Sequence, residues 1–243
     1  MKKSILSFML ALSLFSSVLF SACSSGESSA VYNNSIVLKA VKDADLNSDD
    51  NTEVKKVLEN RLTEMNITKY AVETDEEAKT FTVKYTPEEK QTIDEKELSS
   101  YLSTPAKLTF RPGNQYKNTE NDANGNPVYK TPTGETEKVL MDGSSVKSAG
   151  ARQQQESADG ISFVVELKFT DEGVRTFEKI TTEYLNQTIS VWLDDVMISA
   201  PKVVFPITDG SAVINGIFTK EEAEKLAKQI NSGALPCALE QVK

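Results

Sequence analysis

The 243-residue sequence predicts an α+β protein with two subdomains. The first is a ferredoxin-like subdomain of order βαββαβ, and the second is an α+β subdomain with an antiparallel sheet. Three observations lead to this prediction. Strand-like and helix-like segments alternate over residues 36–111, a polar stretch rich in Asn, Thr, Gly and Pro follows over 112–138, and a second series of strands and helices occupies 139–235.

The first subdomain begins with the strand Ile36–Val41, whose sequence IVLKAV is rich in β-branched residues. A helix follows, because apolar residues recur at helical spacing from Val54 to Met65. Asp50 and Glu53 are spaced as a capping pair at its start. These segments give the first strand and the first helix of the motif.

A hairpin, a second helix and a last strand complete the motif. The hairpin strands are Tyr70–Thr74 and Thr80–Thr86, with a polar turn between them. The second helix starts at a capping pair that begins with Thr92, and it stops at Pro105, which cannot continue a helix. The strand Ala106–Arg111 is then expected to be the last strand of this subdomain.

Residues 112–138 show almost no apolar periodicity, so we expect a loop or a partly disordered segment there. The change of composition falls at Pro112 and at Lys138. These two residues are candidate hinges between the subdomains.

The second subdomain is expected over residues 139–235. A hairpin is predicted with its turn at Asp194, and the best-marked helix of the chain begins with a capping box at Thr219 and stops at Gly233. Residues 236–243 are expected to form a strand that can return to the first subdomain.

The amino terminus resembles a lipoprotein signal. Residues 1–22 have a basic start, an apolar run and small residues before Cys23. Residues 20–23 are similar to a lipobox, although leucine is usual in place of Phe20. We expect a signal peptide over 1–22, a lipidated Cys23 and a flexible tether over 23–35, and hence an extracytoplasmic protein anchored by lipid to the bacterial cell membrane. A plain signal peptide with an incidental cysteine and an uncleaved membrane anchor are the alternatives.

The composition argues against several classes of function. The formal net charge is -9, with no basic block beyond the first few residues, so nucleic-acid binding is not expected. The chain has no histidine, which removes the commonest general base and metal ligand. With Cys23 modified, Cys237 has no cysteine to pair with. We therefore expect no enzyme, no metal and no cofactor.

Two stretches alternate acidic and amide side chains as calcium loops do. The first runs from Asp43 to Asn51, but it lacks the glycine of the sharp turn and has Val54 where a bidentate glutamate belongs. A solvated entrance to a helix is the favoured interpretation. The second runs from Asp122 to Asn126 and is rejected because Pro127 and Thr133 stand at the critical places.

Two further features have a functional and a structural interpretation. Asp194 and Asp195 form a carboxylate pair, but adjacent residues at the tip of a hairpin point different ways into solvent, so a turn is favoured over acid–base chemistry. Trp192 could contact a peptide. Its apolar neighbours Val191 and Leu193 favour burial instead.

An ordered set of segments resembles the SecD family of protein-export subunits and spans residues 36–241. ENRLTEMNI at 59–67 is similar to ENRVNxLGV, AKLTFRP at 106–112 to AxLEFR, and VLMDGSSVKSA at 139–149 to VLLTGxDVxxA. The last quarter is similar to LDGxVxSAPxI, IxGGxAxIxG and FTxEEAxxLAxxLRxGALPxPL.

The resemblance implies a ferredoxin-like base over 36–111 and a mobile head over 139–235 that contacts polypeptide emerging from the Sec channel. It also implies transmembrane segments that link pulling to proton flow, and the sequence that ends at Lys243 contains none of them. The expected function is to assist Sec-dependent translocation by binding emerging polypeptide or the translocon, without a proton-driven motor of its own.

Two departures from the family pattern concern single residues. Asp195 stands where glycine is usual, in a turn expected to need a positive φ, and Cys237 stands where a small apolar residue is usual. Two other functions stay open. One is an envelope lipoprotein that keeps the fold but binds an unrelated peptide, glycan or protein partner. The other is a truncated SecD, which the signal and lipobox disfavour.

Overall fold

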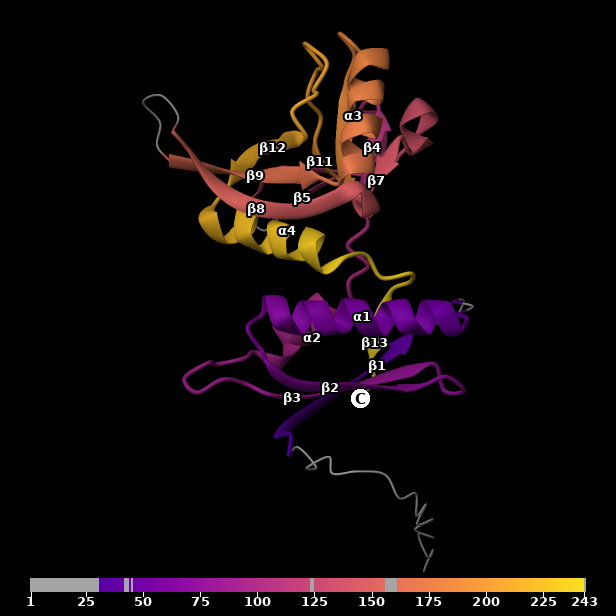
Figure 1. The fold of residues 1–243 in the computed structure, drawn as a ribbon, viewed down its shortest axis with the longest axis vertical. Helices are drawn as coiled ribbons and strands as arrows, with labels where there is room; N and C mark the ends of the chain where they lie inside the picture. Colours follow the sequence, from indigo (N-terminus) through magenta and orange to yellow (C-terminus); the bar gives the residue numbers. More distant parts are fainter. Residues whose placement is uncertain (1–30, 42–43, 45, 123–124, 156–160, 243) are drawn as a thin grey trace, which may run out of the picture. The chain divides into compact units, whose positions relative to one another are not determined.

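The computed structural model describes residues 31–41, 44, 46–122, 125–155 and 161–242. The chain divides into a unit of Met1–Val31 and a compact unit of Tyr32–Lys243. The elements described below all belong to the second unit (Figure 1). Among the described residues, no helix combines the length and the apolar character needed to cross a bilayer.

A four-stranded antiparallel sheet and two helices form the base. In spatial order, the strands are β13 (Leu239–Gln241), β1 (Asn34–Ala40), β3 (Thr80–Thr86) and β2 (Lys69–Asp75). The helices α1 (Ser48–Glu64) and α2 (Glu95–Ser103) cover one face of this sheet (Figure 1). This strand order is that of a ferredoxin-like fold, as the sequence predicted.

Both helices of the base start at caps that lie a few residues from the predicted ones. Asn47 Oδ1 accepts hydrogen bonds from the backbone N–H groups of Asp49 (2.8 Å) and Asp50 (3.0 Å). Asp50 Oδ2 in turn accepts from the N–H of Asn47 (3.0 Å), so the capping box of α1 is Asn47 with Asp50 rather than Asp50 with Glu53. The cap of α2 is Asp94. Asn and Asp cap a helix as well as Ser or Thr does.

The side of the base sheet that faces α1 and α2 supplies the core of the base. The buried residues of this core come from every strand and both helices, so removing their apolar surface from water holds the layers together. The largest of them are Ile36, Leu38, Leu58, Leu62, Ile67, Phe81, Leu98 and Leu102. Cys237 packs against this cluster, and burial raises the pKa of its thiol.

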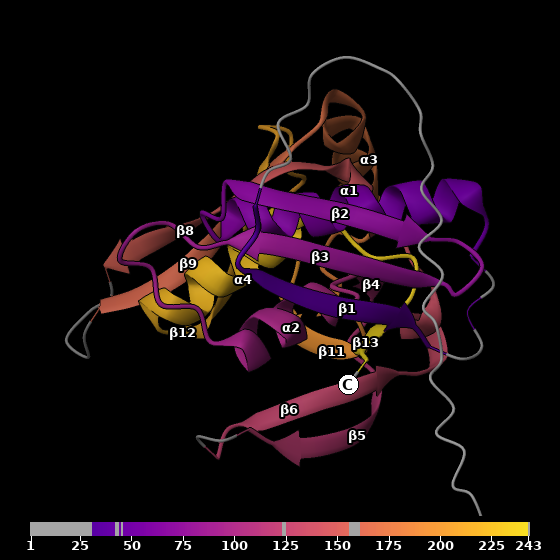
Figure 2. The same cartoon turned by 90° about the horizontal axis from the view of Figure 1, so that it is seen from below.

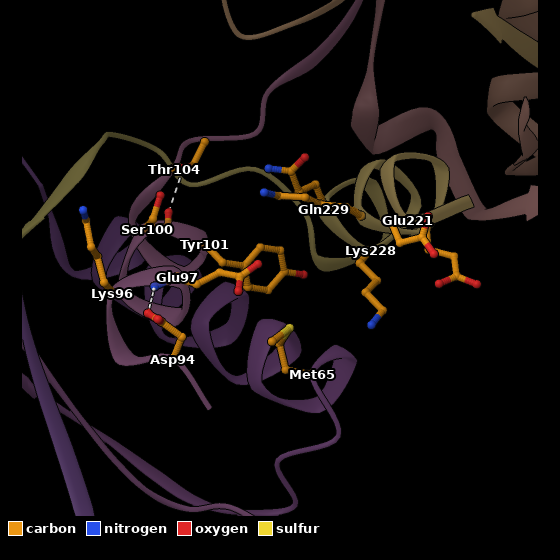
Figure 3. A pocket seen from close by; sticks show the side chains of 12 residues that line it. Met65, Asp94, Lys96, Glu97, Ser100, Tyr101, Thr104, Glu221, Lys228 and Gln229 are labelled. Carbon is orange, nitrogen blue, oxygen red and sulfur yellow. Dashed lines mark hydrogen bonds between the residues drawn. The ribbon is translucent and has the colours of Figure 1, made fainter. Parts of the chain in front are cut away.

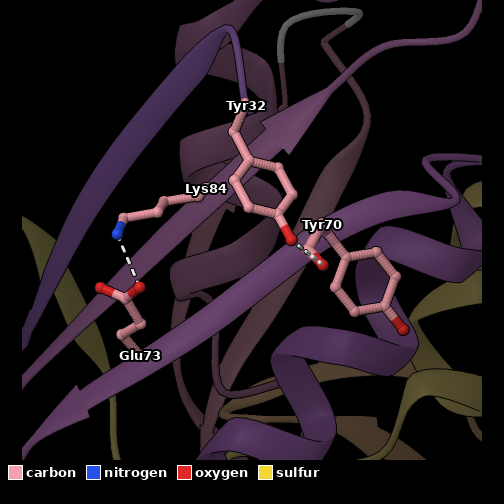
Figure 4. Close-up of polar contacts among 4 residues, drawn as sticks. All are labelled: Tyr32, Tyr70, Glu73 and Lys84. Atoms are coloured by element: carbon pink, nitrogen blue, oxygen red, sulfur yellow. Dashed lines mark hydrogen bonds and ion pairs between the residues drawn. The ribbon is translucent and has the colours of Figure 1, made fainter. Parts of the chain in front are cut away.

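None of the described helices covers the opposite face of the base sheet (Figure 2). Polar contacts lie on the strands there. Lys84 Nζ on β3 is 2.6 Å from Glu73 Oε1 on β2, and the Tyr32 hydroxyl donates to the carbonyl oxygen of Tyr70 (3.3 Å; Figure 4). Because exposed ion pairs contribute little to stability, the apolar face decides the stability of this layer.

The head contains two antiparallel sheets among its described residues. The six-stranded sheet has, in order, β5 (Tyr116–Asn121), β6 (Pro127–Pro132), β11 (Val196–Ser199), β10 (Ile189–Leu193), β4 (Leu108–Pro112) and β7 (Met141–Asp142). The three-stranded sheet has β12 (Ser211–Phe218), β9 (Ile161–Phe169) and β8 (Val146–Gln155). The remaining elements are α3 (Asp171–Glu183), α4 (Lys220–Ser232) and the 3-10 helices η1 (Gly134–Glu137) and η2 (Gly143–Ser145).

The head is an insertion in the base. β13 at the end of the chain pairs with β1, with Leu38 opposite Gln241, and so takes the place of the fourth strand of the base. The prediction that Ala106–Arg111 would be this strand was wrong, because β4 pairs with β10 and β7 in the head. Apolar residues in a short strand predict burial but not the sheet in which the strand is buried.

Three phenylalanines lie together in the core of the head. The ring centroids of Phe110 and Phe177 are 5.6 Å apart, and those of Phe169 and Phe177 are 4.6 Å apart. Phe110 is 2% exposed, and the three rings join β4, β9 and α3. Aromatic pairs in such tilted arrangements stabilise a core beyond their burial alone.

The final helix, α4, has the predicted boundaries. Its capping box is formed by Thr219 and Glu222, and its C-cap is Gly233 with φ +85°. Its apolar face packs against the three-stranded sheet (Figure 1). The buried residues of that face are Ala223, Leu226, Ala227 and Ile230.

The expectation of a loop over 112–138 was wrong, because strands β5 and β6 and the helix η1 lie there. The six residues of β5 are all exposed, so this hairpin buries little and shows no apolar alternation. The hairpin is held by the backbone pairing of β5 with β6. The contact between the rings of Tyr116 and Tyr129 and the ion pair of Lys130 with Glu120 add to it. Such a strand has no hydrophobic signal in the sequence.

Candidate functional site

An apolar groove lies in the head between α3, the two sheets and the segment Pro201–Ile207. Its cavity volume is about 190 Å³. Several of its lining side chains also belong to the core of the head, namely Phe110, Leu167, Phe177, Ile189, Val191 and Ile214. Lys202 is the one charged residue among the described residues that line it.

Two large apolar side chains at this groove are open to solvent. Val204 is 69% exposed and Phe205 is 65% exposed. The chain on either side of them is fixed. The N–H of Val203 donates to the carbonyl oxygen of Gln187 (2.8 Å), and the N–H of Ile207 donates to the buried Thr181 Oγ1 (3.0 Å). Adjacent exposed hydrophobic residues on a fixed backbone indicate a binding surface.

The size and lining of the groove limit what it can bind. A dry apolar cavity of about 150 Å³ holds a benzene molecule, so the groove has room for one aromatic or branched side chain. Sites for drug-sized ligands and cofactors start at about 300 Å³. The described residues that line the groove include no carboxylate, thiol or imidazole, and most of them are apolar, so the groove is suited to apolar groups.

Sequence reasoning did not single out Val204 and Phe205. The signal that could have found them is the run Val203-Val204-Phe205 between Pro201 and Pro206, because consecutive apolar residues outside any periodic segment have no face to bury.

Trp192 is buried, as its apolar neighbours indicated. The indole is 0% exposed, and its Nε1–H donates to Ser190 Oγ (2.8 Å). This hydrogen bond satisfies the only polar atom of the side chain. Trp192 is therefore part of the packing of the head and not an exposed contact for a peptide.

Asp194 and Asp195 lie at the predicted turn between β10 and β11, but they differ in role. Asp194 has the positive φ, +54°, that was expected at Asp195. Its carboxylate does not point freely into solvent, because it accepts from the backbone N–H groups of Ala106 (3.2 Å) and Lys107 (2.8 Å). Asp195 is exposed. The pair is a structural turn that holds the chain where it enters the head.

The two stretches that resemble calcium loops make structural contacts in their described parts. Asn47 caps α1, and Asp122 accepts from the backbone and the side chain of Asn126. Asp43 and Asp45 lie outside the described residues. Within the part of the chain that the structure describes, no three acidic or cysteine side chains gather as a metal site would require.

A second, larger cavity of about 640 Å³ lies between α2 of the base and α4 of the head (Figure 3). Its lining carries both signs of charge, with Asp94, Glu97 and Lys96 on α2 or its cap and Lys225 and Lys228 on α4. The Tyr101 ring also faces it. Burial raises the pKa of Tyr101, and the nearby Ser232 hydroxyl and Arg61 oppose this shift.

The mixed charges of this second cavity do not define a ligand. The Tyr101 hydroxyl has no hydrogen-bond partner within the described residues. Water is sufficient to satisfy a hydroxyl that borders a polar cavity. The apolar groove is therefore the stronger candidate.

The candidate hinge residues Pro112 and Lys138 both lie inside the head. Pro112 ends β4 opposite Ile189, and Lys138 follows η1. The segments that join base and head are instead Thr104–Lys107, after α2, and the residues between α4 and β13.

A hinge at Pro112 and Lys138 stays a prediction that amide hydrogen exchange tests. If these residues move, the amides next to them exchange faster than those of Ala223–Ile230 in α4, because hinge opening exposes backbone hydrogen bonds to water. Equal protection of the two regions contradicts a hinge there.

Residues 118–237 match the family model described as the P1 head subdomain of SecDF. The SecD translocase subunit of Leptotrichia buccalis is 33% identical over 150 residues, which cover 62% of this chain and 32% of that protein. This chain carries a domain homologous to P1 of SecD and SecDF.

Other relatives agree with the P1 assignment. The SecD subunit of Petrotoga mobilis is 43% identical over 83 residues, 34% of this chain and 18% of its own length. A solved structure of SecDF, described as a membrane component that enhances protein export, has a TM-score of 0.73 at 24% identity and covers 86% of this chain and 98% of that one. The fold is therefore that of a P1 base and head, while the match spans about a third or less of the SecD relatives.

Proposed function

We propose that this protein assists Sec-dependent protein export by binding extended, apolar segments of exported polypeptide in the groove of the head. The main support is that Val204 and Phe205 are exposed to solvent beside a cavity lined by apolar side chains. Relatives of the P1 domain are named as protein translocase subunits, which supports the same role. The Sec translocon is the proposed partner.

Binding in this groove is non-catalytic. An unfolded chain exposes apolar side chains that a folded client has buried, and inserting one large side chain in the groove contributes about 1.5–3 kcal/mol. Each contact is weak and needs no fixed sequence. A groove of this kind suits many clients and releases each of them readily.

Peptide binding tests the groove directly. We expect the full-length Val204→Ser, Phe205→Ser double variant to bind a fluorescent extended peptide with a central phenylalanine about tenfold more weakly than the native protein, because it loses apolar contact area. The measurement is fluorescence anisotropy at fixed salt.

The matched control is Val139→Ser. Val139 is also an exposed large hydrophobic residue of the head, at 43% exposure, but it does not line the groove. We expect it to bind with native affinity. Equal affinity of the double variant and of Val139→Ser contradicts a role of the groove in binding.

We also propose that the protein is extracytoplasmic and anchored through a lipid on Cys23, with a signal peptide before it. The proposal depends on the sequence of residues 1–23, which lie outside the described residues. A nine-residue segment joins Cys23 to Tyr32 and spans at most about 30 Å when extended. A lipid at Cys23 would keep the base close to the membrane.

Metabolic labelling with a fatty acid tests the anchor. We expect Cys23→Ser to abolish both the label and the membrane association of the protein, because two acyl chains supply stable anchoring. Cys237→Ser is the matched control and should keep both. Label that persists in Cys23→Ser contradicts lipidation at this residue.

A further inference from the structure

Arg61 on α1 is a fully buried cation at the place where base and head meet. Its side chain is 0% exposed. A buried guanidinium is costly unless its five N–H donors are satisfied. In the base, Nη1 donates to the carbonyl oxygens of Tyr101 (2.9 Å), Leu102 (2.8 Å) and Thr104 (2.6 Å).

The same guanidinium also reaches the head. Nε donates to Ser232 Oγ (3.4 Å), and Nη2 donates to the carbonyl oxygen of Gly233 (3.4 Å). Beside it, Asn60 Nδ2 donates to the carbonyl oxygen of Ser232 (3.3 Å). Ser232 is the last residue of α4.

Arg61 therefore lies at the carboxyl ends of two helices, α2 and α4. Neither helix has a basic residue in its own last turn. The carbonyl groups at a helix carboxyl terminus carry a partial negative charge, which favours a cation there. Burial nevertheless lowers the pKa of Arg61 to about 10, a shift that Tyr101 and Asp194 oppose.

The two sets of hydrogen bonds differ in length. Those from Nη1 to Tyr101, Leu102 and Thr104 measure 2.6–2.9 Å, and those to Ser232 and Gly233 measure 3.3–3.4 Å. The bond from Nη2 to the carbonyl oxygen of Pro105, in the segment that joins base and head, is also long (3.3 Å). Hydrogen bonds from N–H to oxygen weaken beyond about 3.2 Å. We call the hydrogen bonds that Asn60 and Arg61 make at the ends of α2 and α4 the joint. Its contacts with Ser232 and Gly233 in the head are thus its weaker part.

The chain that follows α4 is fixed again in the base. Leu235 is 4% exposed within the core of the base, and its N–H donates to the carbonyl oxygen of Pro105 (2.8 Å). Only Gly233 and Ala234 therefore separate the end of α4 at Ser232 from Leu235 in the base.

We infer that Arg61 is a positioning residue that stays bound to the base and sets the orientation of α4 through its weaker contacts with Ser232 and Gly233. The joint opens at these head-side contacts before any other part of the base–head boundary yields. This inference goes beyond the proposed function, because it holds whether or not the groove binds polypeptide.

Distances across the joint test the inference in the full-length protein. Spin labels are attached at Lys56→Cys on α1 and Lys225→Cys on α4, in a Cys23→Ser, Cys237→Ala background. We expect one narrow distance distribution for the native joint. The Asn60→Ala, Ser232→Ala double variant should raise the fraction at other distances about fivefold or more, because it loses two of the head-side hydrogen bonds.

Three further variants make the outcome specific. Ser103→Ala removes a serine at the end of α2 whose hydroxyl, among the described residues, bonds to the carbonyl oxygen of Ser100 in the same helix, so it should keep the native distribution. Ser232→Thr keeps the hydroxyl and should restore the narrow peak. Arg61→Lys keeps the positive charge near α2 but lacks the planar guanidinium whose N–H groups reach both helices, so it should broaden the distance distribution.

Two results would overturn the inference. One is a double variant whose distance distribution equals that of Ser103→Ala. The other is an Arg61→Lys variant that folds and keeps the native peak. A double variant that does not fold would also contradict it, because the contacts removed would then be essential and not the weakest of the joint.

Discussion

We expect Arg61→Ala to lower the free energy of unfolding by roughly 3–5 kcal/mol, the range found when one partner of a buried charged network is removed. The loss has a simple cause. The carbonyl oxygens of Tyr101, Leu102 and Thr104 lose their shared donor in a place where water has little access. Each buried acceptor left without a partner costs about 1–3 kcal/mol.

Urea unfolding followed by circular dichroism measures this effect. Arg152→Ala on β8 is the matched control, because its side chain is exposed and its loss should change the free energy of unfolding by less than about 0.5 kcal/mol. A loss below about 1 kcal/mol for Arg61→Ala would mean that Arg61 does not hold the ends of α2 and α4.

Phe110→Ala should have an effect of similar size in the head. Phe110 is 2% exposed and contacts the rings of Phe169 and Phe177 at centroid distances of 6.2 and 5.6 Å. Truncating a buried phenylalanine removes its transfer free energy and leaves a cavity, which together cost about 3–5 kcal/mol. Thermal unfolding monitored by circular dichroism reports the loss.

Phe205→Ala is the matched control for Phe110→Ala, because the chemical change is the same at a side chain that is 65% exposed. We expect it to leave the free energy of unfolding within about 0.5 kcal/mol of the native value while it weakens peptide binding. If Phe205→Ala destabilised the fold as much as Phe110→Ala, Phe205 would belong to the core and not to a binding surface.

The parts of the fold that the sequence predicted correctly are those with a strong local signal. The α4 helix has a capping box at Thr219, a periodic apolar face and a glycine stop at Gly233, and the structure has the same boundaries. The first five elements of the base also follow their apolar periodicity. Local patterns of this kind come from the burial of one face of each element.

The errors arise where the decisive partner is far away in the chain. β13 lies in the segment 236–243 that was expected to return to the base, and it pairs there with β1. The error was to take Ala106–Arg111 as the last strand of the base, because β4 pairs with β10 and β7 in the head. The hairpin of β5 and β6 is held by backbone pairing with little burial, and it has no periodicity to detect. In both cases, the sheet that a strand joins is determined by its pairing with strands that are distant in the sequence.

The candidate groove was hidden from sequence reasoning for a related reason. Its lining comes from residues that span Phe110 to Asn215, and its exposed members follow no period. The sequence singled out Asp194 and Trp192 for comparison but favoured a turn for the first and burial for the second, and the structure confirms both. An apolar residue in a sequence looks the same whether it is buried or left open for a client.

Crosslinking in cells tests whether the groove of the head binds exported polypeptide. A photoreactive amino acid is placed at Phe205, or at Val139 as the control, in cells that hold a stalled exported precursor. We expect a precursor adduct from position 205 and little or none from position 139. No precursor or channel adduct from position 205, or equal yields from both positions, would contradict the binding of exported polypeptide by this groove.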